Sequence, residues 1–333
     1  MIVRGFGMCT RFFRCSVLSA LLAVSTLPFT ALILVGLSHA QAGESPTTKS
    51  LKHFDHVLIV VLENQNYASV MKDPFMKELA SKGSSFTYFS NLAHPSYPNY
   101  LAMIAGSTFK TEGSDSQKTF PDDTEHRTIA DLLDSRNYAE NYPGNDKTPY
   151  LRPSASRYAR KHVPFLSFAK IQKEGFSKVV SVDTNTGKPF IDDISNFRKD
   201  PEKNPLPQYM FYSPNMDDDG HDPYFRPKVG LKKSSTWLRS FLKNWLAFDE
   251  KTWTPSDDKM KGLLVIITYD EAEGSSTGNL YTVFLGRMVK TQEISPEYNH
   301  YSVLRTIEDN FNLDPLQKDS GDGKAHVITE VWR

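Results

Sequence analysis

The stretch HVLIVVLEN, residues 56–64, is the part of the sequence that decides the predicted fold. It is apolar over six consecutive positions and rich in β-branched residues, which is typical of a strand buried on both faces of a parallel sheet. The apolar run stops abruptly at Glu63 and Asn64. Two polar side chains are therefore expected just beyond the carboxyl end of a central strand.

Later parts of the chain contain further apolar runs of the same kind. We expect further strands at residues 178–182, 208–212, 262–269 and 280–285. We expect helices at residues 129–136, capped by Thr128, at 237–245 and at 303–311. The segments 110–126, 183–207 and 215–235 are predicted loops. Strands that alternate with helices predict an α/β fold with a mostly parallel central sheet flanked by helices.

Residues 1–42 have the pattern of a secretory signal. A basic region without acidic residues precedes an apolar run at residues 17–37, and Ala40 and Ala42 fit the small-x-small pattern of a cleavage site. We predict cleavage after Ala42, a single domain at residues 43–333, and a periplasmic or secreted location for the mature protein. The alternative is that the long apolar run remains as a membrane anchor.

Removal of the signal changes the charge and the cysteine content. Both cysteines, Cys9 and Cys15, leave with it, so no disulfide is expected in the mature chain. Three arginines and no acidic residue leave, so the formal charge falls from 0 to about −3. A mildly acidic chain has no basic field to attract nucleic acid. Contact with a membrane is expected only if the signal is retained or the substrate is a lipid.

The strand ends carry the first candidate site. Asp270 and Glu271 follow the strand predicted at residues 262–269, as Glu63 and Asn64 follow the first strand. Ligands of open parallel sheets bind beyond the carboxyl ends of the strands. Adjacent buried carboxylates repel each other, and a divalent cation with oxygen ligands would offset that repulsion. The alternative is that one carboxylate caps a helix and the other is solvated.

The segment HPSYPNY, residues 94–100, places Ser96 at or near the start of a helix. A serine there can cap the helix by accepting a backbone hydrogen bond. It can also act as a nucleophile where the helix N-terminus favours a phosphate. Spacing alone favours the cap.

Two histidines in polar surroundings are further candidates. Asp217 and His221 form a D-x-x-x-H pattern in an acidic stretch, where a calcium loop is disfavoured because Lys228 replaces the glutamate expected at loop position 12. His300 opens the helix predicted near residue 303. Each could bind a metal, bind phosphate or act as a general acid. A lone histidine in a loop is more often a surface residue, and the position of His300 at a helix start is only slightly more informative.

The chain resembles the bacterial and fungal phosphoesterase family that includes acid phosphatases and non-haemolytic phospholipases C, a family similar to the alkaline phosphatase superfamily. The order of the matching segments is more specific than any one of them. They are residues 57–64, 94–100, 158–165, 213–217, 269–271 and 299–302. The short chain and the HPSYPNY segment fit the acid-phosphatase-like branch better than the longer phospholipases.

The resemblance implies roles for individual residues. It implies a divalent cation, of unknown identity, held by Glu63, Asn64, Asp270 and Glu271, with Asp217 as an additional candidate ligand. It implies that Ser96 is the nucleophile, that His221 or His300 protonates the leaving alcohol, and that the phosphate is bound by Asn99, His162, His221 and His300. Two positions depart from the expected pattern: Val163 stands where asparagine is expected, and Glu271 where aspartate is common.

The sequence thus predicts an exported, metal-dependent phosphoesterase that hydrolyses small phosphate esters, monoesters in preference, through phosphorylated Ser96. One alternative is a phospholipase C or another phosphodiesterase with the same site. An alternative from another class is an exported binding protein with a degenerate site. A sulfatase is disfavoured because no cysteine remains and no C/S-x-P-x-R segment is present.

Overall fold

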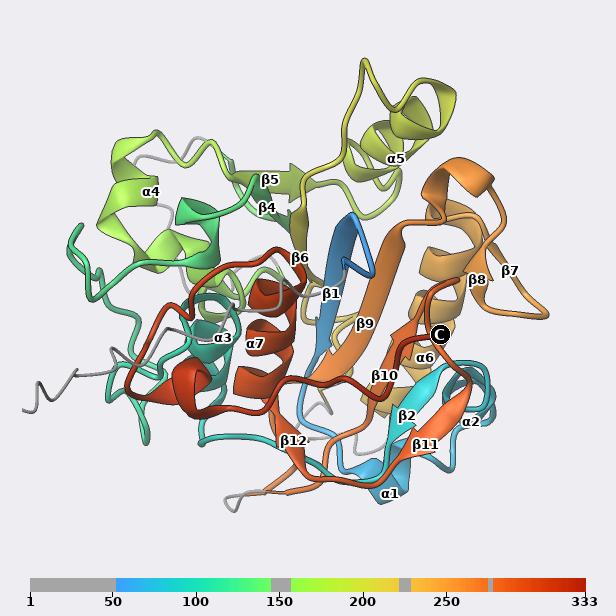
Figure 1. Cartoon of the computed structure of the whole chain (residues 1–333), viewed down its shortest axis with the longest axis horizontal. Helices are drawn as coiled ribbons and strands as arrows, with labels where there is room; N and C mark the ends of the chain where they lie inside the picture. Colours follow the sequence, from blue (N-terminus) through green and yellow to red (C-terminus); the bar gives the residue numbers. More distant parts are fainter. Residues whose placement is uncertain (1–51, 145–156, 222–228, 275–277) are drawn as a thin grey trace, which may run out of the picture. The chain divides into compact units, whose positions relative to one another are not determined.

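The strand at residues 56–62 lies in the interior of an eight-stranded sheet. The computed structural model describes residues 52–144, 157–221, 229–274 and 278–333, all within the unit Thr48–Arg333 (Figure 1). The predicted signal and its cleavage site lie outside the described residues. In the described part, no helix has both the length and the apolar character that a membrane crossing requires.

The sheet is mostly parallel, as predicted. Its order is β11-β2-β10-β9-β1-β6-β4-β5, and only β10 runs antiparallel to its neighbours. The strands of this sheet are β1 His56–Leu62, β2 Ser84–Phe86, β4 Ser135–Glu140, β5 Val179–Val182, β6 Tyr209–Ser213, β9 Leu263–Tyr269, β10 Thr282–Leu285 and β11 Gln292–Ile294. Two small two-stranded sheets are formed by β3 Phe89–Ser90 with β12 Tyr298–Asn299, and by β7 Phe248–Asp249 with β8 Thr254–Pro255.

Helices cover both faces of the sheet. The α-helices are α1 Tyr67–Val70, α2 Pro74–Ala80, α3 Ser96–Ala105, α4 Ala169–Lys173, α5 Phe190–Lys199, α6 Val229–Ser240 and α7 His300–Asn310. A π-helical turn, η4 Phe241–Trp245, continues α6. The 3-10 turns are η1 Ile129–Asp131, η2 Arg160–His162, η3 Pro164–Ser167, η5 Asp258–Met260 and η6 Gly321–Lys324. Helices α3 and α7 pack against each other (Figure 1).

Side chains of β6 point alternately to the two faces of the sheet and contact the helices on both. Tyr209 faces α3, where its hydroxyl donates to the Met103 carbonyl over 3.1 Å. Tyr212 points to the opposite face, where its ring lies 4.7 Å from Phe241 and 5.8 Å from Trp237, measured between centroids. Successive strand side chains point to opposite faces, so one strand anchors both helical layers.

The prediction of a helix at residues 129–136 was wrong. Thr128 does form a capping box with Asp131, but the turn ends there as η1, and β4 begins at Ser135. This strand pairs with β5 and β6, so backbone hydrogen bonds to two neighbours override the local helical signal. A second miss is α5, which lies within the segment predicted as a loop at 183–207.

The strand register brings three strand ends to one edge of the sheet. Leu62 lies opposite Tyr269, and the Asp270 amide donates to the Leu62 carbonyl over 3.0 Å. The Glu63 amide donates to the Asp219 carbonyl over 2.7 Å. The chain after β1 therefore lies between the chain after β9 and the loop after β6, and the acidic residues of all three meet.

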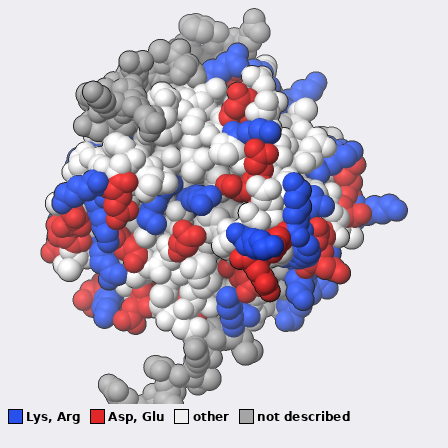
Figure 2. Space-filling view, turned by 90° about the horizontal axis from the view of Figure 1, so that it is seen from above, with Lys and Arg blue, Asp and Glu red and all other residues white. Residues whose placement is uncertain are grey.

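The opposite charges are intermixed on the face shown in Figure 2. Lysine and arginine side chains lie among aspartate and glutamate side chains there, without a large area of one sign. Such a face has no long-range field of one sign.

Candidate active site

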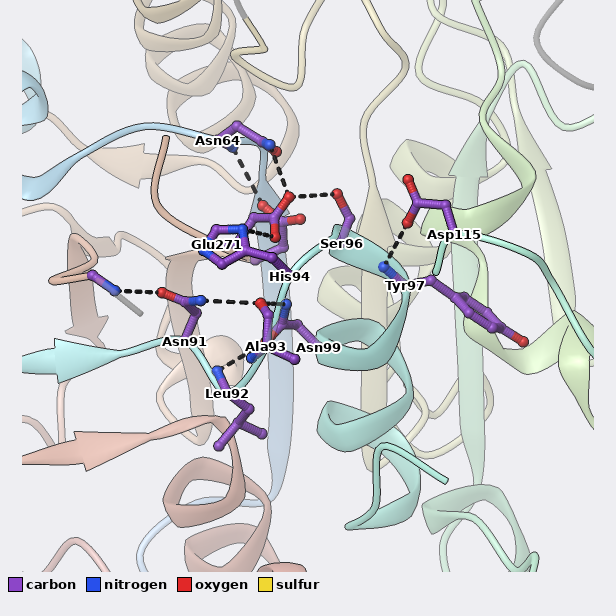
Figure 3. Close-up of polar contacts among 12 residues, drawn as sticks. Asn64, Asn91, Leu92, Ala93, His94, Ser96, Tyr97, Asn99, Asp115 and Glu271 are labelled. Carbon is purple, nitrogen blue, oxygen red and sulfur yellow. Dashed lines mark hydrogen bonds and ion pairs between the residues drawn. The ribbon is translucent and has the colours of Figure 1, made fainter. Parts of the chain in front are cut away.

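Ser96 is the first residue of α3, but its side chain does not cap the helix. Its hydroxyl oxygen lies 3.1 Å from Glu271 Oε1 and 3.4 Å from Glu63 Oε2 (Figure 3). A hydroxyl carries one proton, so these two contacts are alternatives and the shorter one is favoured. The side chain is fully buried. Ser96 is thus directed at the carboxylates of the strand ends rather than at its own helix.

Asn99 holds the loop that carries Ser96. Its Oδ1 accepts from the backbone amides of Leu92 at 2.9 Å and Ala93 at 3.2 Å, and its Nδ2 donates to the Ala93 carbonyl over 2.8 Å (Figure 3). The Asn99 amide thus holds the segment that leads into Ser96. Its predicted part in phosphate binding stays a prediction.

Glu63 is fully buried and bound by two aromatic side chains. The Tyr100 hydroxyl donates to Glu63 Oε1 over 2.8 Å, and His162 Nε2 lies 2.9 Å from the same oxygen, although the imidazole is not aligned for a good hydrogen bond. The two rings stack with centroids 5.0 Å apart. Burial alone would raise the pKa of Glu63, but His162 and Lys161 together hold this pKa below its ordinary value. Glu63 is therefore ionised, as a metal ligand must be.

Asn64, Asp270 and Glu271 form the other half of the cluster. The Asn64 amide nitrogen Nδ2 donates to Glu271 Oε1 over 2.9 Å, and the Asn64 backbone amide donates to Asp270 Oδ1 over 3.3 Å. Asn64 adopts a left-handed backbone conformation, with φ of 42°, which asparagine tolerates better than most residues. Burial raises the pKa of Asp270, and the charges of Glu63 and Glu271 raise it further.

His94 completes the surroundings of Glu271. Its Nδ1 lies 2.6 Å from Glu271 Oε2 (Figure 3). Burial raises the pKa of Glu271, and His94 partly opposes this shift. The imidazole thus orients the carboxylate that accepts the closest hydrogen bond from Ser96.

The acidic loop after β6 brings Asp219 to the cluster rather than Asp217. Asp217 is half-exposed and pairs with Arg157 at 2.8 Å and Lys233 at 3.8 Å. Asp219 is buried, and its Oδ1 accepts from the His221 amide over 2.9 Å. Burial raises the pKa of Asp219, and the charge of Glu63 adds to this shift. Asp217 was the additional candidate ligand, but the structure places it in surface ion pairs, because the chain turns it outward.

The three predicted histidines occupy different positions. His162 is buried on Glu63, as described above. His300 is fully buried at the start of α7, and its Nε2 lies 2.8 Å from the Asp270 carbonyl oxygen. Burial lowers the pKa of His300 to about 4. His221 is exposed on the loop beside Asp219. The structure therefore brings His162 and His300 to the carboxylates and leaves His221 at the rim.

The oxygen atoms of this cluster are of the kind that binds a divalent cation. Oδ2 of Asp270, Oδ2 of Asp219 and Oδ1 of Asn64 are buried and have no hydrogen-bond partner among the described residues. Unpartnered buried oxygens beside further carboxylates are costly, and a cation with oxygen ligands would satisfy them. Within the described ranges, however, no three His, Cys, Asp or Glu side chains are arranged around one point as a metal site requires. Glu63 and Glu271 instead turn toward Tyr100, His162 and His94.

Sequence reasoning missed four residues of this site. They are His94, Tyr100, Lys161 and Asp219. Lys161 Nζ lies 3.0 Å from Ser96 Oγ and 3.0 Å from Asp115 Oδ2. The first three lie in segments that the sequence singled out, at residues 94–100 and 158–165, but nothing local shows that they meet Glu63, Glu271 and Ser96.

Comparison with known families identifies the family of this chain. A model of the phosphoesterase family matches residues 66–314. The chain belongs to the phosphoesterase family. Two relatives resemble it over most of its length, and their names place them among hydrolases that act on phosphoric ester bonds.

The relatives differ in length from this phosphoesterase. A protein of Kluyveromyces lactis named probable acid phosphatase is 31% identical over 289 residues, which cover 83% of this chain and 62% of that protein. A phosphatidylinositol-3-phosphatase of Mycobacterium tuberculosis is 30% identical over 334 residues, which cover 97% of this chain and 95% of that protein. The chain thus spans less than two thirds of the fungal relative and nearly all of the mycobacterial one.

The fold agrees with the family. A protein of the alkaline phosphatase superfamily from Vibrio parahaemolyticus aligns with a TM-score of 0.50 and 13% identity, covering 87% of this chain and 77% of that protein. At this identity the likeness concerns the fold alone. The predicted alkaline-phosphatase-like architecture is confirmed.

Proposed function

We propose that this phosphoesterase is a metal-dependent hydrolase of phosphate monoesters that forms a phosphoenzyme on Ser96. Membership of the family supports phosphoric ester hydrolysis as the class of reaction. The names of both relatives support monoesters, since one is named probable acid phosphatase and the other phosphatidylinositol-3-phosphatase. A phosphate monoester is therefore the expected class of substrate.

The position of Ser96 is the observation that carries this proposal. The serine begins a helix without capping it, is fully buried, and directs its hydroxyl at Glu271 and Glu63. Pro95 holds the N-cap position and Ser96 is the first helical residue, so the Ser96 side chain is free to face the carboxylates. A hydroxyl held against carboxylates, at a helix N-terminus that favours anions, is the arrangement of a nucleophile that attacks phosphorus.

The proposed reaction has two displacements. In the first, Ser96 Oγ bonds to phosphorus while the ester P–O bond breaks, and the hydroxyl proton leaves toward the carboxylates that it already faces. The departing alcohol takes a proton from water or from a histidine at the rim, with His221 as the candidate. In the second, water attacks phosphoserine, which releases phosphate and restores the Ser96 hydroxyl.

We propose that a divalent cation is bound by Glu63, Asn64, Asp270 and Glu271, with Asp219 as a further acid beside them. When bound, such a cation would neutralise negative charge on the phosphoryl group and favour ionised Ser96. The unpartnered oxygens of Asp270, Asp219 and Asn64 support this assignment.

Metal analysis together with a pair of substrates tests the proposal. Purified protein should contain a divalent metal, lose activity on chelation and regain it when the metal returns. Turnover of para-nitrophenyl phosphate should exceed that of its bis ester. Preference for the bis ester would favour a phosphodiesterase of the phospholipase C type, and binding of metal or phosphate without any turnover would favour a binding protein.

We also propose export, with removal of residues 1–42. Mass spectrometry of the protein recovered outside the cytoplasm should find Gly43 at its N-terminus. A full-length species in the membrane fraction would contradict cleavage and support the membrane anchor.

A further inference from the structure

Lys161 lies at the centre of the site but has no part in the proposed function above. Its Nζ lies 3.0 Å from Ser96 Oγ and 3.0 Å from Asp115 Oδ2, and only 22% of its side chain is exposed. The nearest charged groups include Glu63, Asp115 and Asp270. A single ammonium group therefore touches the proposed nucleophile and lies among several carboxylates.

Asp115 fixes this ammonium group relative to α3. Its Oδ2 accepts from Lys161, and its Oδ1 accepts from the Tyr97 backbone amide over 3.1 Å. Figure 3 shows Asp115 beside the first turn of α3, next to Ser96. The lysine is thus tied to the residue that follows the nucleophile, so Nζ and Oγ keep their relative positions.

The Ser96 hydroxyl has a defined direction as a result. Lys161 Nζ is a donor only, so Ser96 Oγ accepts from it and its own proton must point elsewhere. The nearest acceptor is Glu271 Oε1 at 3.1 Å. A phosphorus atom that bonds to Oγ must therefore lie close to the ammonium group, within reach of its remaining N–H donors.

The surroundings of Lys161 favour its charged form. Burial alone would lower the pKa of this amine, but Glu63 and Asp115 outweigh burial and raise the pKa above its ordinary value. The lysine is therefore protonated, and its ammonium group is held in position by Asp115.

Other lysines of the same region differ in this respect. Lys170 and Lys173 each pair with one aspartate on the surface, and 49% and 68% of their side chains are exposed. Among the described residues, neither lysine forms a hydrogen bond with a hydroxyl of the site. Lys161 is the buried member of the three, and it divides its donors between a carboxylate and the nucleophile.

We propose that Lys161 is a catalytic residue that binds the phosphoryl oxygens beside Ser96 and makes the site selective for dianionic monoesters over monoanionic diesters. The inference rests on the proposed function, whose substrate class it explains. A fixed cation attracts a dianion more strongly than a monoanion, and charge-assisted hydrogen bonds are about twice as strong as neutral ones.

The test is the ratio of activity on a phosphate monoester to activity on the corresponding diester, measured for each variant. We would measure kcat/KM for para-nitrophenyl phosphate and for its bis ester above about pH 6, where the monoester is a dianion. The proteins are the wild type, Lys161→Gln, Lys161→Arg and the matched control Lys173→Gln. The ratio does not depend on the folded fraction of a variant, because both substrates report on the same molecules.

We expect Lys161→Gln to lower kcat/KM for the monoester about tenfold to a hundredfold, in keeping with the loss of a charged hydrogen bond. The loss for the bis ester should be smaller, so the ratio should fall. Inhibition by inorganic phosphate should weaken in parallel. Lys161→Arg should retain most of the ratio because it keeps the charge, and Lys173→Gln should match the wild type.

An unchanged ratio in Lys161→Gln, with phosphate inhibition as in the wild type, would overturn the role of Lys161 and leave the proposed function intact. A wild-type protein inactive on both esters would overturn the proposed function and this inference with it. The two failures are therefore distinguishable.

Discussion

Two clusters of buried acidic residues in this protein differ in how their oxygens are satisfied. The first is the strand-end cluster, Glu63, Asp219, Asp270 and Glu271. The second is the pair formed by Glu308 of α7 and Asp322 of η6. All six side chains are almost completely buried, so burial alone does not distinguish a site from a structural element.

The Glu308–Asp322 pair is satisfied within the protein. Glu308 accepts from Arg305 at 3.2 Å and from the Leu316 amide at 3.0 Å. Asp322 accepts from the Leu316 amide at 2.9 Å and the Gln317 amide at 3.0 Å. The backbone amides of Leu316 and Gln317 join the pair to the chain after α7, and Arg305 adds a contact within α7 itself.

The strand-end cluster is incompletely satisfied. Oδ2 of Asp219 and Oδ2 of Asp270 have no hydrogen-bond partner in the described part of the chain. Buried polar groups left without partners are costly and are rare in folded proteins, so these carboxylate oxygens call for an explanation. The comparison teaches that unpartnered oxygens, rather than buried charge, mark the place where a ligand is expected. The predictions below test this difference.

The largest effect is expected at Ser96. Ser96→Ala removes the atom that would attack phosphorus, so kcat should fall by about three orders of magnitude or more. The unfolding midpoint should fall by only a few degrees, because the side chain makes no cap hydrogen bond and the cost is limited to its bonds with Glu271 and Lys161. Steady-state kinetics and thermal unfolding measure the two quantities, with exposed Ser116→Ala as the control.

Acid quenching during turnover gives independent evidence. Wild-type protein should yield a phosphorylated peptide that contains Ser96, and the Ser96→Ala variant should not. Inversion of configuration at a chiral phosphate, without a trapped phosphoserine, would point to direct attack by water and contradict the phosphoenzyme.

The next largest effect is expected from substitutions of the strand-end cluster, with a substitution in the Glu308–Asp322 pair for comparison. Asp270→Asn and Glu63→Gln should each lower bound metal and activity together, by about a hundredfold in activity, because each removes a negative ligand. Glu308→Gln should leave both quantities close to the wild type. Metal analysis and kcat/KM on one substrate provide the measurements.

Full metal occupancy and normal activity in both strand-end variants would remove the metal hypothesis. Loss of metal in Glu308→Gln as well would show that buried charge in general, rather than the strand-end cluster, controls binding.

A smaller contrast is expected within the loop after β6. Asp219→Asn keeps an oxygen for the His221 amide but removes the buried charge, so activity should fall about tenfold. Asp217→Asn should stay within about twofold, because an exposed ion pair contributes only about 0–1 kcal/mol. Measurement of kcat/KM for both variants under the same conditions decides between Asp219 and Asp217. A larger loss of activity in Asp217→Asn would restore Asp217 as the candidate ligand.

The smallest effect concerns pH and stability at Glu308. Burial, together with the hydrogen bond to Asp322, raises the pKa of Glu308 from 4.5 to about 9. A raised folded pKa means that the contribution to stability is complete below about pH 4.5 and is lost as pH rises toward 9. Glu308→Gln removes this dependence, so the Tm of the variant relative to the wild type should rise between pH 5 and pH 9, by about 2 °C or more.

Thermal unfolding at pH 5, 7 and 9 checks this expectation, with exposed Glu125→Gln as the control. A Tm difference between variant and wild type that does not change with pH would show that Glu308 is not protonated in the folded protein.

The local sequence pattern was sufficient to predict most of the sheet. The strands near residues 56–62, 209–213 and 263–269 are confirmed, because an unbroken apolar run buried on both faces is a signal contained in the strand itself. The same reasoning predicted that polar residues follow these strands at one edge. β4 was missed because SRNYAE, residues 135–140, lacks such a run and becomes a strand only by pairing with both β5 and β6.

The sequence by itself therefore determined the fold class, the family and the strand ends that carry Glu63 and Asp270. Only the tertiary structure decided which side chains meet there. Lys161 reaches Ser96 from a position 65 residues later in the chain, and the loop after β6 presents buried Asp219 instead of Asp217. The reason is physical: apolar periodicity is a property of neighbours along the chain, whereas hydrogen bonds and charge contacts depend on distances that the packing of separate elements sets.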